Sequence, residues 1–405
     1  MAFVVFVCPM YSVAATHMIE ATAGLPGVTC AVISPESWEG MPEPARSRIV
    51  GHWRVGNLFD VGELTAAVQG LARSHGAVHR LFAAFEQLQV PIAEVRERLG
   101  VVGMGVETAK NFRDKHRMKA LFREHGLPCA KASLAHSADE TVQAANAIGY
   151  PVVIKPPEGA GAAATFRADS EAQLREGLAA FRFGESPTLV EEFVQGTEHS
   201  CESITIGGTT VWQSVSHYAP TPLEVKMTPW IQWAVTLPRE ERVPAEDDLR
   251  SAASRALAAL GMDTGLSHME WFRRPDGSIA ISEVAARPPG AQITTLISRA
   301  HDFDFVEAWA RLLIFGTFEA PERKYATGAA YLRAQGHGRI VAVHGLREAH
   351  QAVGALICDA KLPVIGDTPK DTYEGDGYVI VRHPETAVVE RALVTLITTI
   401  RVELG

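Results

Sequence analysis

Residues 264–290 contain the feature that most constrains how this chain can fold, because they read as two strands joined by a tight turn. Asp276 and Gly277 are typical of a two-residue type I′ turn, in which both central residues need positive φ angles. Counting outward from that turn places Glu270 opposite Glu283. Residues that face each other across an antiparallel pair lie on the same side of the sheet, with Cβ atoms about 5 Å apart. The sequence therefore predicts two neighbouring carboxylates on one face of a hairpin.

Two carboxylates this close repel each other unless a cation lies between them. Mg²⁺ suits a site that offers few carboxylates and takes its other ligands from phosphate oxygens. Strand alternation places His268 and Arg287 on the same face as the two glutamates. A solvated hairpin face with ordinary charged side chains is the alternative. We favour it less because apolar residues occupy both faces, namely Met269, Trp271, Ile279 and Ile281.

The length of 405 residues predicts two or three domains, since one hydrophobic core rarely organises so long a chain. Hydrophobic residues make up 47% and charged residues 21%, as in ordinary soluble proteins. The net charge of −9, without a long Lys/Arg run, argues against nucleic acid or an anionic membrane as the main partner. Five scattered cysteines form no CxxC pair, so neither a zinc site nor a disulfide framework is predicted. The apolar run at residues 2–8 is too short for a signal or membrane segment, and we expect a cytoplasmic protein.

The first hundred residues alternate between strand-like and helix-like patterns. Strands are predicted at residues 3–8, 28–34 and 78–83, with helices at 12–22 and 61–73. Strands that alternate with helices at this spacing predict a parallel, Rossmann-like α/β unit. No GxGxxG follows the first strand, so a structural role is favoured over dinucleotide binding.

Lysines mark the next two segments. Residues 107–125 read as one basic helix, on which Lys110 and Lys119 are interpreted as a solvated face. An apolar strand then ends at Lys155 and is followed by a loop of proline, glycine and alanine at residues 156–164. Small residues let backbone N–H groups approach an anion closely, so the loop and its lysine are placed to meet phosphate. A strand-end lysine that reaches solvent is the alternative.

Residues 188–206 read as two strands joined by a short acidic and aromatic segment and a glycine turn. The short segment consists of Glu191, Glu192, Phe193 and Val194, a mixture suited to a slot for adenine. Backbone groups there would read the base edge while apolar side chains cover its faces. Glu198 could accept hydrogen bonds from ribose hydroxyls, although an acidic hairpin turn without a ligand is an open alternative.

Together these segments resemble the ATP-grasp superfamily over roughly residues 105–320. The resemblance depends on RDK at 113–115, YPVVIKP at 150–156, LVEEFVQGTE at 189–198, HMEWF at 268–272 and SEVAARPPG at 282–290. Within the superfamily the chain looks most like carboxylate–amine ligases that include L-amino acid ligases, which have a Gly-Arg-Ile strand similar to GHGRIVAVHG at 336–345. The resemblance implies an α/β fold of three domains. These are an N-terminal Rossmann-like domain at 1–106, a central ATP-grasp domain at 107–320 and a small C-terminal α+β domain at 321–405.

The resemblance also implies roles for single residues. Lys115 and Lys155 would contact the nucleotide phosphates, and Glu270 and Glu283 would ligate Mg²⁺ or Mn²⁺. Arg287 would contact the transferred phosphoryl group or the acyl phosphate. The adenine linker would be Glu191, Glu192, Phe193 and Val194, with Glu198 on the ribose.

Two departures from the family pattern concern the metal and phosphate sites. The usual Glu-x-Asn-x-Arg strand has Ala285 in place of the asparagine, so one ligand for a second Mg²⁺ is missing, and the phosphate loop is rich in alanine. The predicted register pairs His268 with Ala285, which leaves room beside the imidazole. Our hypothesis is that His268 borders the acyl-phosphate site and orients or deprotonates the incoming amine. A half-buried structural histidine is the alternative.

The implied activity is an ATP-dependent ligation of a carboxylate to an amine through an acyl phosphate, with amino acids as expected substrates and a homodimer as the expected assembly. A biotin-carboxylase-like enzyme, a thioester-forming ligase and a non-catalytic nucleotide-binding regulator are the alternatives. Residues 216–242, rich in proline and tryptophan, are interpreted as an ordered strand or loop over a site, with Lys226 and Trp230 as the weakest site candidates. An aromatic packing strip is equally compatible with that segment.

The C-terminal part reads as a mixture of helices and strands. Helices are predicted at residues 302–318, 346–357 and 385–403, and strands at 328–345 and 376–383.

Overall fold

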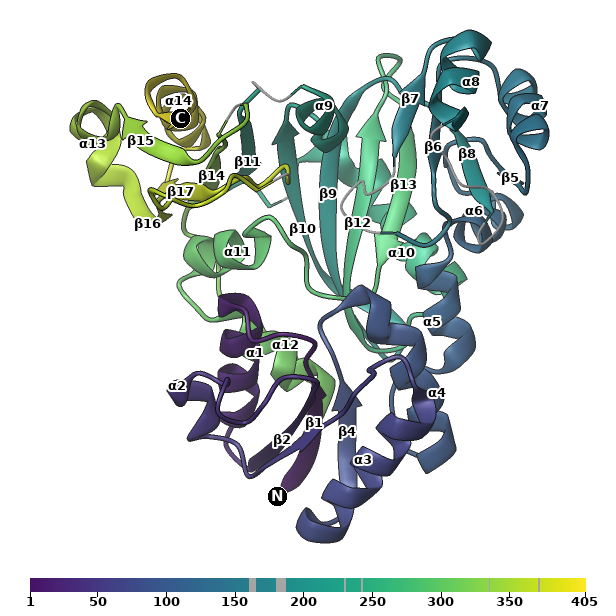
Figure 1. Ribbon diagram of the computed structural model, residues 1–405, viewed down its shortest axis with the longest axis vertical. Coiled ribbons are helices and arrows are strands. Elements are labelled where there is room, and N and C mark those ends of the chain that lie inside the picture. Colours follow the sequence, from purple (N-terminus) through teal and green to yellow (C-terminus); the bar gives the residue numbers. More distant parts are fainter. Residues whose placement is uncertain (160–164, 180–186, 229–230, 242, 335, 371) are drawn as a thin grey trace.

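The computed structural model describes residues 1–159, 165–179, 187–228, 231–241, 243–334, 336–370 and 372–405 (Figure 1). Its strands form sheets of four, eight, two and four strands, and helices cover them. The alanine loop at 160–164 and Trp230, both discussed above, lie outside the described residues.

The N-terminal unit is the predicted parallel α/β arrangement. Its sheet has the order β3-β2-β1-β4, and the strands pair in parallel. Four elements, α2, β3, η1 and α4, were not predicted. The elements are β1 (Ala2–Val7), α1 (Val13–Ala23), β2 (Val28–Ser34), α2 (Glu43–Arg46), β3 (Gly51–Arg54), α3 (Val61–His75), β4 (Val78–Phe82), η1 (Glu86–Leu88) and α4 (Gln89–Leu99).

The predicted single helix over residues 107–125 is wrong, because the chain forms two helices there. They are α5 (Val106–Arg113) and α6 (Lys115–Glu124), separated at Asp114. The Asp114 carboxylate accepts from the backbone N–H groups of His116 and Arg117, so it caps the second helix. The break places Lys115 at the first position of α6, where its side chain can turn towards the hairpin.

A small antiparallel sheet follows, with the order β5-β8-β6-β7. Its strands are β5 (Ala132–Ala135), β6 (Val152–Lys155), β7 (Phe166–Ala168) and β8 (Thr188–Glu192). Helices α7 (Ala138–Ile148) and α8 (Glu171–Ala179) pack on it, and Figure 1 shows this unit beside the larger sheet. Lys155 is the last residue of β6, as the sequence predicts.

The largest sheet has the order β13-β12-β9-β10-β11-β14-β17-β16, so strands from the C-terminal segment continue the sheet that contains the hairpin. The interpretation of residues 216–242 as an ordered strand or loop is confirmed for its described part. The elements of the sheet and its neighbours are β9 (Thr197–Ile206), β10 (Thr209–Ala219), α9 (Pro222–Met227), β11 (Trp233–Leu237), η2 (Pro244–Glu246), α10 (Asp247–Leu260), β12 (Gly265–Arg273), β13 (Ile279–Ala285), β14 (Ala326–Leu332), β16 (Ile357–Lys361) and β17 (Gly377–His383).

The hairpin keeps the predicted pairing of Glu270 with Glu283, although its turn differs from the prediction. Arg274 N donates to Ser278 O at 2.8 Å, so three residues close the turn rather than two, and only Gly277 among them has a positive φ, of 84°. A one-residue register shift between the turn and the glutamates adds an extra residue, Ser282, to β13. The longer turn and the bulge offset each other, and the register at the glutamates is unchanged.

Helices and strands of the C-terminal part are shorter than predicted. The helix predicted at 302–318 is α12 (Phe305–Phe315), and an unpredicted α11 (Ile293–His301) precedes it. The strand predicted at 328–345 divides into β14 and β15 (Ile340–His344), and that at 376–383 is β17. The remaining elements are α13 (Leu346–Val353), η3 (Gly354–Leu356), α14 (Thr386–Thr399) and β18 (Arg401–Leu404). The helix predicted at 385–403 is wrong over β18, and β16 was not predicted.

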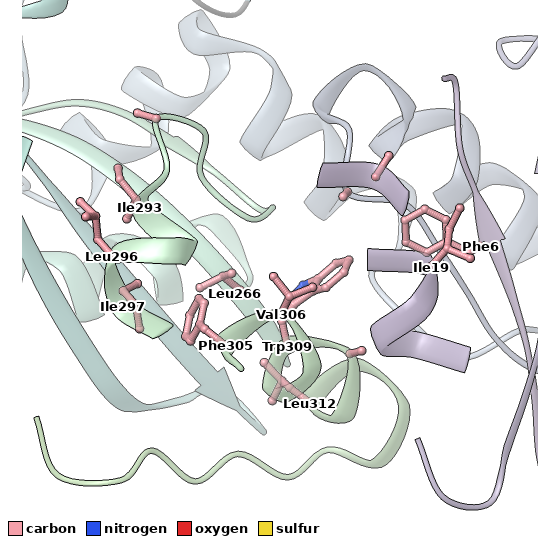
Figure 2. Packing of buried hydrophobic residues seen from close by; sticks show 14 of the residues in the cluster. Phe6, Ile19, Leu266, Ile293, Leu296, Ile297, Phe305, Val306, Trp309 and Leu312 are labelled. Carbon is pink, nitrogen blue, oxygen red and sulfur yellow. The ribbon is translucent and has the colours of Figure 1, made fainter. Parts of the chain in front are cut away.

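Helix α12 joins the N-terminal unit to the large sheet through buried side chains (Figure 2). Trp309 of α12 contacts Phe82 of β4 edge to face, with ring centroids 5.7 Å apart, and Phe82 contacts Phe6 in the same way at 5.5 Å. Leu266 of β12 belongs to the same cluster. This shared core holds the end of β4 close to the hairpin. Across the residues described, no helix has the length and apolar character to cross a membrane.

Candidate functional site

A pocket of about 560 Å³ lies where the small sheet, the large sheet and α6 meet. The residues predicted for the nucleotide, metal and reaction sites line this pocket, which brings together side chains from segments up to 172 positions apart, from Lys115 to Arg287. The weaker candidate Lys226 is not one of its lining residues, and Trp230 lies outside the described residues. The predicted residues are Lys115, Lys155, Glu191, Glu192, Phe193, Val194, Glu198, His268, Glu270, Glu283 and Arg287. The adjacent elements also supply Ser282 and Gly159.

Three carboxylates lie together on the floor of the pocket. Glu270 of β12 faces Glu283 of β13, and Glu198 of β9 lies beside them, opposite Phe272 on β12. Burial and the negative charges of Glu270 and Glu283 raise the pKa of Glu198 well above its usual value. Burial is the larger cause of this shift, and the two neighbouring carboxylates add to it.

Lys115 is the nearest cation to this group. Its Nζ lies 3.1 Å from Glu283 Oε2 and donates to Gly159 O at 2.8 Å. Burial opposes ionisation of Glu283, but Lys115, Lys155 and Arg287 together lower its pKa to about 2. Glu283 is therefore an anion at neutral pH. Lys115 also links the start of the phosphate loop to the acidic pair.

Lys155 and Lys119 share one carboxylate. Glu191 Oε2 lies 2.7 Å from Lys155 Nζ, and its Oε1 lies 3.3 Å from Lys119 Nζ. Burial opposes the charge of Lys155, but Glu191 and Glu283 raise its pKa, so the lysine stays protonated. The side chain of Glu191 therefore holds two lysines, whereas the sequence analysis placed it in the adenine linker.

The interpretation of Lys119 as part of a solvated face is wrong, because its side chain is completely buried. Its Nζ donates to the carbonyl of Ser282 at 2.8 Å, the extra residue of the bulge in β13. Burial lowers the pKa of Lys119, and the charge of Glu191 opposes that effect. Lys110, on the preceding helix, is 45% exposed at its side chain and pairs with Glu107, as predicted for a solvated face.

The slot predicted for adenine is lined by apolar groups from both sheets. Phe193 lies under the guanidinium of Arg167, with the Arg167 Cζ 4.1 Å from the ring centroid. Val194 and Phe272 also line the slot, and Ala130 and Val153 complete this side of the pocket. Flat apolar walls beside backbone groups suit a planar base.

Glu192 is turned away from that slot. Its carboxylate lies 2.9 Å from Arg274 Nη1 and accepts from the backbone N–H of Lys131 at 3.1 Å. The side chain therefore ties β8 to neighbouring segments, while its backbone lies next to the slot. Lys226 lies on α9, whose residues Leu223 and Glu224 line the pocket.

Arg287 is held by a residue that the sequence analysis missed. Its Nε and Nη2 donate to Glu86 Oε2 at 3.0 and 2.9 Å. The other oxygen of Glu86 accepts from Arg113 Nη1 at 2.9 Å, and Arg113 Nη1 lies 3.4 Å from Gly159 O. Glu86 begins η1 in the N-terminal unit and is 7% exposed. No local signal in the sequence pointed to it, because its partners are distant in the chain.

His268 is engaged with carboxylates on both sides. Its Nδ1 donates to Glu202 Oε1 at 2.8 Å, and its Nε2 lies 3.6 Å from Glu270 Oε1. Burial opposes protonation, but the hydrogen bonds and charges of Glu202 and Glu270 raise the pKa of His268 to about 9. The role of His268 in orienting or deprotonating the incoming amine stays a prediction. The expected pairing of His268 with Ala285 is confirmed.

The residues fit a divalent cation that takes few ligands from the protein. Over the part of the chain described here, no group of three or more His, Cys, Asp or Glu side chains is arranged as a complete metal site. Glu270 and Glu283 nevertheless face each other, and Glu198 lies on the same face of the sheet beside them. Mg²⁺ accepts such a site because phosphate oxygens and water supply its other ligands.

Comparison with known proteins points to one family. Residues 120–302 match the ATP-grasp domain family. The chain is 25% identical to the L-arginine-specific L-amino acid ligase of Bacillus subtilis over 228 residues, which cover 55% of this chain and 54% of that protein. It is 27% identical to the alanine–anticapsin ligase of Bacillus subtilis over 262 residues, 59% of this chain and 55% of that protein. The chain thus spans about half the length of these curated relatives.

Solved structures extend the likeness to the whole fold. The crystal structure of L-amino acid ligase from Bacillus licheniformis superposes with a TM-score of 0.78 at 17% identity, covering 100% of this chain and 99% of that chain. An N5-carboxyaminoimidazole synthetase from Staphylococcus aureus, solved with ADP, superposes with a TM-score of 0.71 at 14% identity, covering 98% and 97% of the two chains. The protein has the ATP-grasp fold, as expected from its motifs.

Proposed function

We propose, from the match of residues 120–302 to the ATP-grasp domain family, that the protein is an ATP-dependent carboxylate–amine ligase that releases ADP and phosphate. One observation carries the proposal. The lysines expected at the nucleotide phosphates and the facing Glu270 and Glu283 line a single pocket. The similarity to amino acid ligases supports amino acids as substrates.

In the proposed reaction a carboxylate oxygen of one substrate attacks the γ-phosphorus of ATP, and the bond to the β,γ-bridging oxygen breaks to give an acyl phosphate and ADP. The amine of the second substrate then attacks the acyl carbon. Phosphate leaves with the bonding electron pair, and the nitrogen loses a proton to give the amide. A bound Mg²⁺, held by Glu270 and Glu283, would neutralise charge on the phosphates.

The protein contributes alignment and charge in this scheme. Lys155 would contact the nucleotide phosphates, kept protonated by Glu191. The ion pair between Lys115 and Glu283 would open when the cation binds, or the Glu283 carboxylate would contact both cations. Arg287, held by Glu86, is placed beside the acidic pair, where it would neutralise the transferred phosphoryl group. His268 would act as a fixed hydrogen-bond donor beside Glu270 rather than as a base.

ADP release with paired amino acids, measured in the presence and absence of excess EDTA, tests the function. We expect ADP and an amide product that both depend on two substrates and on Mg²⁺ or Mn²⁺. Full activity in EDTA would contradict the metal assignment. ATP binding without ADP release for any pair would favour the nucleotide-binding regulator considered above, while thiol-dependent or biotin-dependent release would favour the other two classes. The homodimer, the cytoplasmic location and domain limits at 106 and 320 stay predictions.

A further inference from the structure

The pocket has a second end, away from the lysines and the adenine slot. It is lined by side chains from β10, α9, β11, the start of α11 and the segment before β17. These are Tyr218, Leu223, Met227, Trp233, Ile293 and Tyr373. These six side chains are apolar or aromatic, and we refer to them as the aromatic end. Thr221, Glu224 and Thr228, from α9 and the residues that flank it, also line the pocket.

The rings of the aromatic end are fixed by one another. Trp233 contacts Tyr218 edge to face, with centroids 5.5 Å apart, and Tyr373 in the same way at 4.9 Å. Behind them Tyr331 stacks on Trp233 at 4.6 Å. Trp233 Nε1 donates to Pro220 O at 3.0 Å, and the Tyr331 hydroxyl donates to Ala291 O. The polar atoms of both inner rings are thus satisfied within the protein. Both rings are buried, so the surface open to a ligand belongs to Tyr373, Leu223 and Met227.

The aromatic end adjoins the acidic pair. Ser200 of β9 pairs with both Glu270 of β12 and Ser216 of β10, and Tyr218 lies two residues further along β10 on the same face. Tyr218 is therefore displaced from Glu270 by about 12 Å at the usual strand dimensions. Burial, followed by the charge of Glu270, raises the pKa of both Tyr218 and Tyr373. Arg287 and Glu283 also act on Tyr373. A molecule that reacts at the acidic pair can therefore extend its side chain into the aromatic end.

We propose that the aromatic end is the side-chain subsite for one of the two substrates and takes an amino acid, or a related small molecule, with a bulky apolar or aromatic side chain. This inference rests on the proposed ligase function. Buried apolar surface contributes about 25 cal/mol per Å², and aromatic pairs add to that contribution. Among the lining residues that the structure describes, the pocket cations are Lys115, Lys155, Arg167, Arg287 and the protonated His268, none of which belongs to the aromatic end. A charged side chain would lose its hydration there.

Product formation from a panel of substrates tests the subsite. Wild-type protein with ATP and Mg²⁺ is given pairs drawn from alanine, leucine, phenylalanine, tryptophan, glutamate and lysine, and the amide products are identified by mass spectrometry. For one of the two product positions we expect kcat/KM for leucine, phenylalanine or tryptophan to exceed that for alanine, glutamate and lysine at least tenfold. A preference for alanine or for a charged residue at both positions would overturn the inference while leaving the ligase function intact.

Variants of Tyr373 test whether the aromatic end affects binding of the bulky substrate without affecting binding of ATP. Tyr373→Ala should raise the KM of the preferred substrate at least tenfold while the KM for ATP stays within about twofold. Tyr373→Phe keeps the ring and should stay within about threefold of the wild type for both substrates. An unchanged KM for the bulky substrate in a folded Tyr373→Ala variant would overturn the inference.

Calorimetry tests the subsite even if no pair supports ADP release, an outcome that would remove the proposed function. Phenylalanine and alanine are titrated into the wild-type protein and into Tyr373→Ala. Binding of phenylalanine at least tenfold tighter than alanine, lost in the variant, would support the subsite. Equal binding of both amino acids by the wild-type protein would overturn it.

Discussion

Glu86 and Arg287 lie 201 positions apart in the chain and are joined by two hydrogen bonds to a single carboxylate oxygen, 3.0 and 2.9 Å long. The second oxygen of Glu86 holds Arg113, which also reaches Gly159 of the phosphate loop. A residue of the N-terminal unit thus holds the arginine that we place at the transferred phosphoryl group. The contact makes that unit part of the proposed reaction centre.

Glu86→Gln should lower kcat about tenfold or more, with a smaller effect on the KM for ATP. An amide offers one oxygen to two guanidinium groups, and charge-assisted hydrogen bonds of this kind contribute about 1.5–3 kcal/mol each. Steady-state kinetics with ATP and an active substrate pair measure the effect. Glu94→Gln is the matched control, because its carboxylate lies 4.0 Å from Arg98 in an exposed pair of the same unit. Wild-type kcat in a folded Glu86→Gln variant would show that Glu86 does not position Arg287.

Lys119→Met should reduce the free energy of unfolding by about 2–4 kcal/mol, since it removes one partner of a buried ion pair. It also removes the donor to the carbonyl of Ser282, so the bulge next to Glu283 should loosen and activity should fall. Denaturant unfolding checks the stability. Lys110→Met, at the exposed lysine of the preceding helix, should change the stability by less than about 0.5 kcal/mol. Similar losses in both variants would argue against the buried role of Lys119.

Glu283→Gln should cost more activity than Glu270→Gln, although both face the same cation site. Glu283 also pairs with Lys115, so its loss disturbs the lysine that we propose at the phosphates as well as the proposed metal site. We expect kcat to fall about 100-fold for Glu283→Gln, the scale seen when one charged group is removed from a reaction centre. In a titration with Mn²⁺, both variants should need a higher Mn²⁺ concentration than the wild type to reach half of their maximal activity. Glu319→Gln, at an exposed position, is the control and should keep wild-type kinetics.

We expect His199 to make the stability of the folded protein depend on pH. Its side chain points to the other face of the sheet from that of Glu198. There its ring stacks on Trp271, with centroids 4.7 Å apart, and also contacts His217. Burial, followed by the charges of His217 and Arg273, lowers the pKa of His199 to about 3. Between about pH 6.5 and pH 3 the unfolded chain binds a proton there that the folded protein does not, so stability falls as the pH falls, by up to about 1.4 kcal/mol per pH unit.

Thermal unfolding of wild type and His199→Gln across that pH range measures this contribution. The variant should lose less stability on acidification than the wild type does. His136→Gln, at an exposed histidine, should follow the wild-type curve. Parallel curves for wild type and His199→Gln would contradict the assignment.

The sequence by itself determined the strand patterns and the order of the charged motifs along them. Strand alternation has a period of two, so it predicted which face of the hairpin holds Glu270 and Glu283, and the structure confirms their pairing. The turn itself was predicted wrongly, since it has three residues rather than two. The pairing is still as predicted because the bulge at Ser282 shifts the register back by one residue. Local periodicity specifies a face well and specifies turn length and bulges poorly, since those depend on contacts from elsewhere, such as Lys119.

Only the tertiary structure decided which charged side chains are buried and what they touch. Lys110 and Lys119 both read as basic residues of one helix, yet one is half-exposed and the other has no exposed surface, because Glu191 and Ser282 arrive from distant strands. The same holds for Glu86, whose partners come from two other segments, and for Tyr373, which the last part of the sheet brings to the pocket. Electrostatic pairing and the composition of an aromatic wall depend on distances between remote segments, and no local pattern in the sequence encodes those distances.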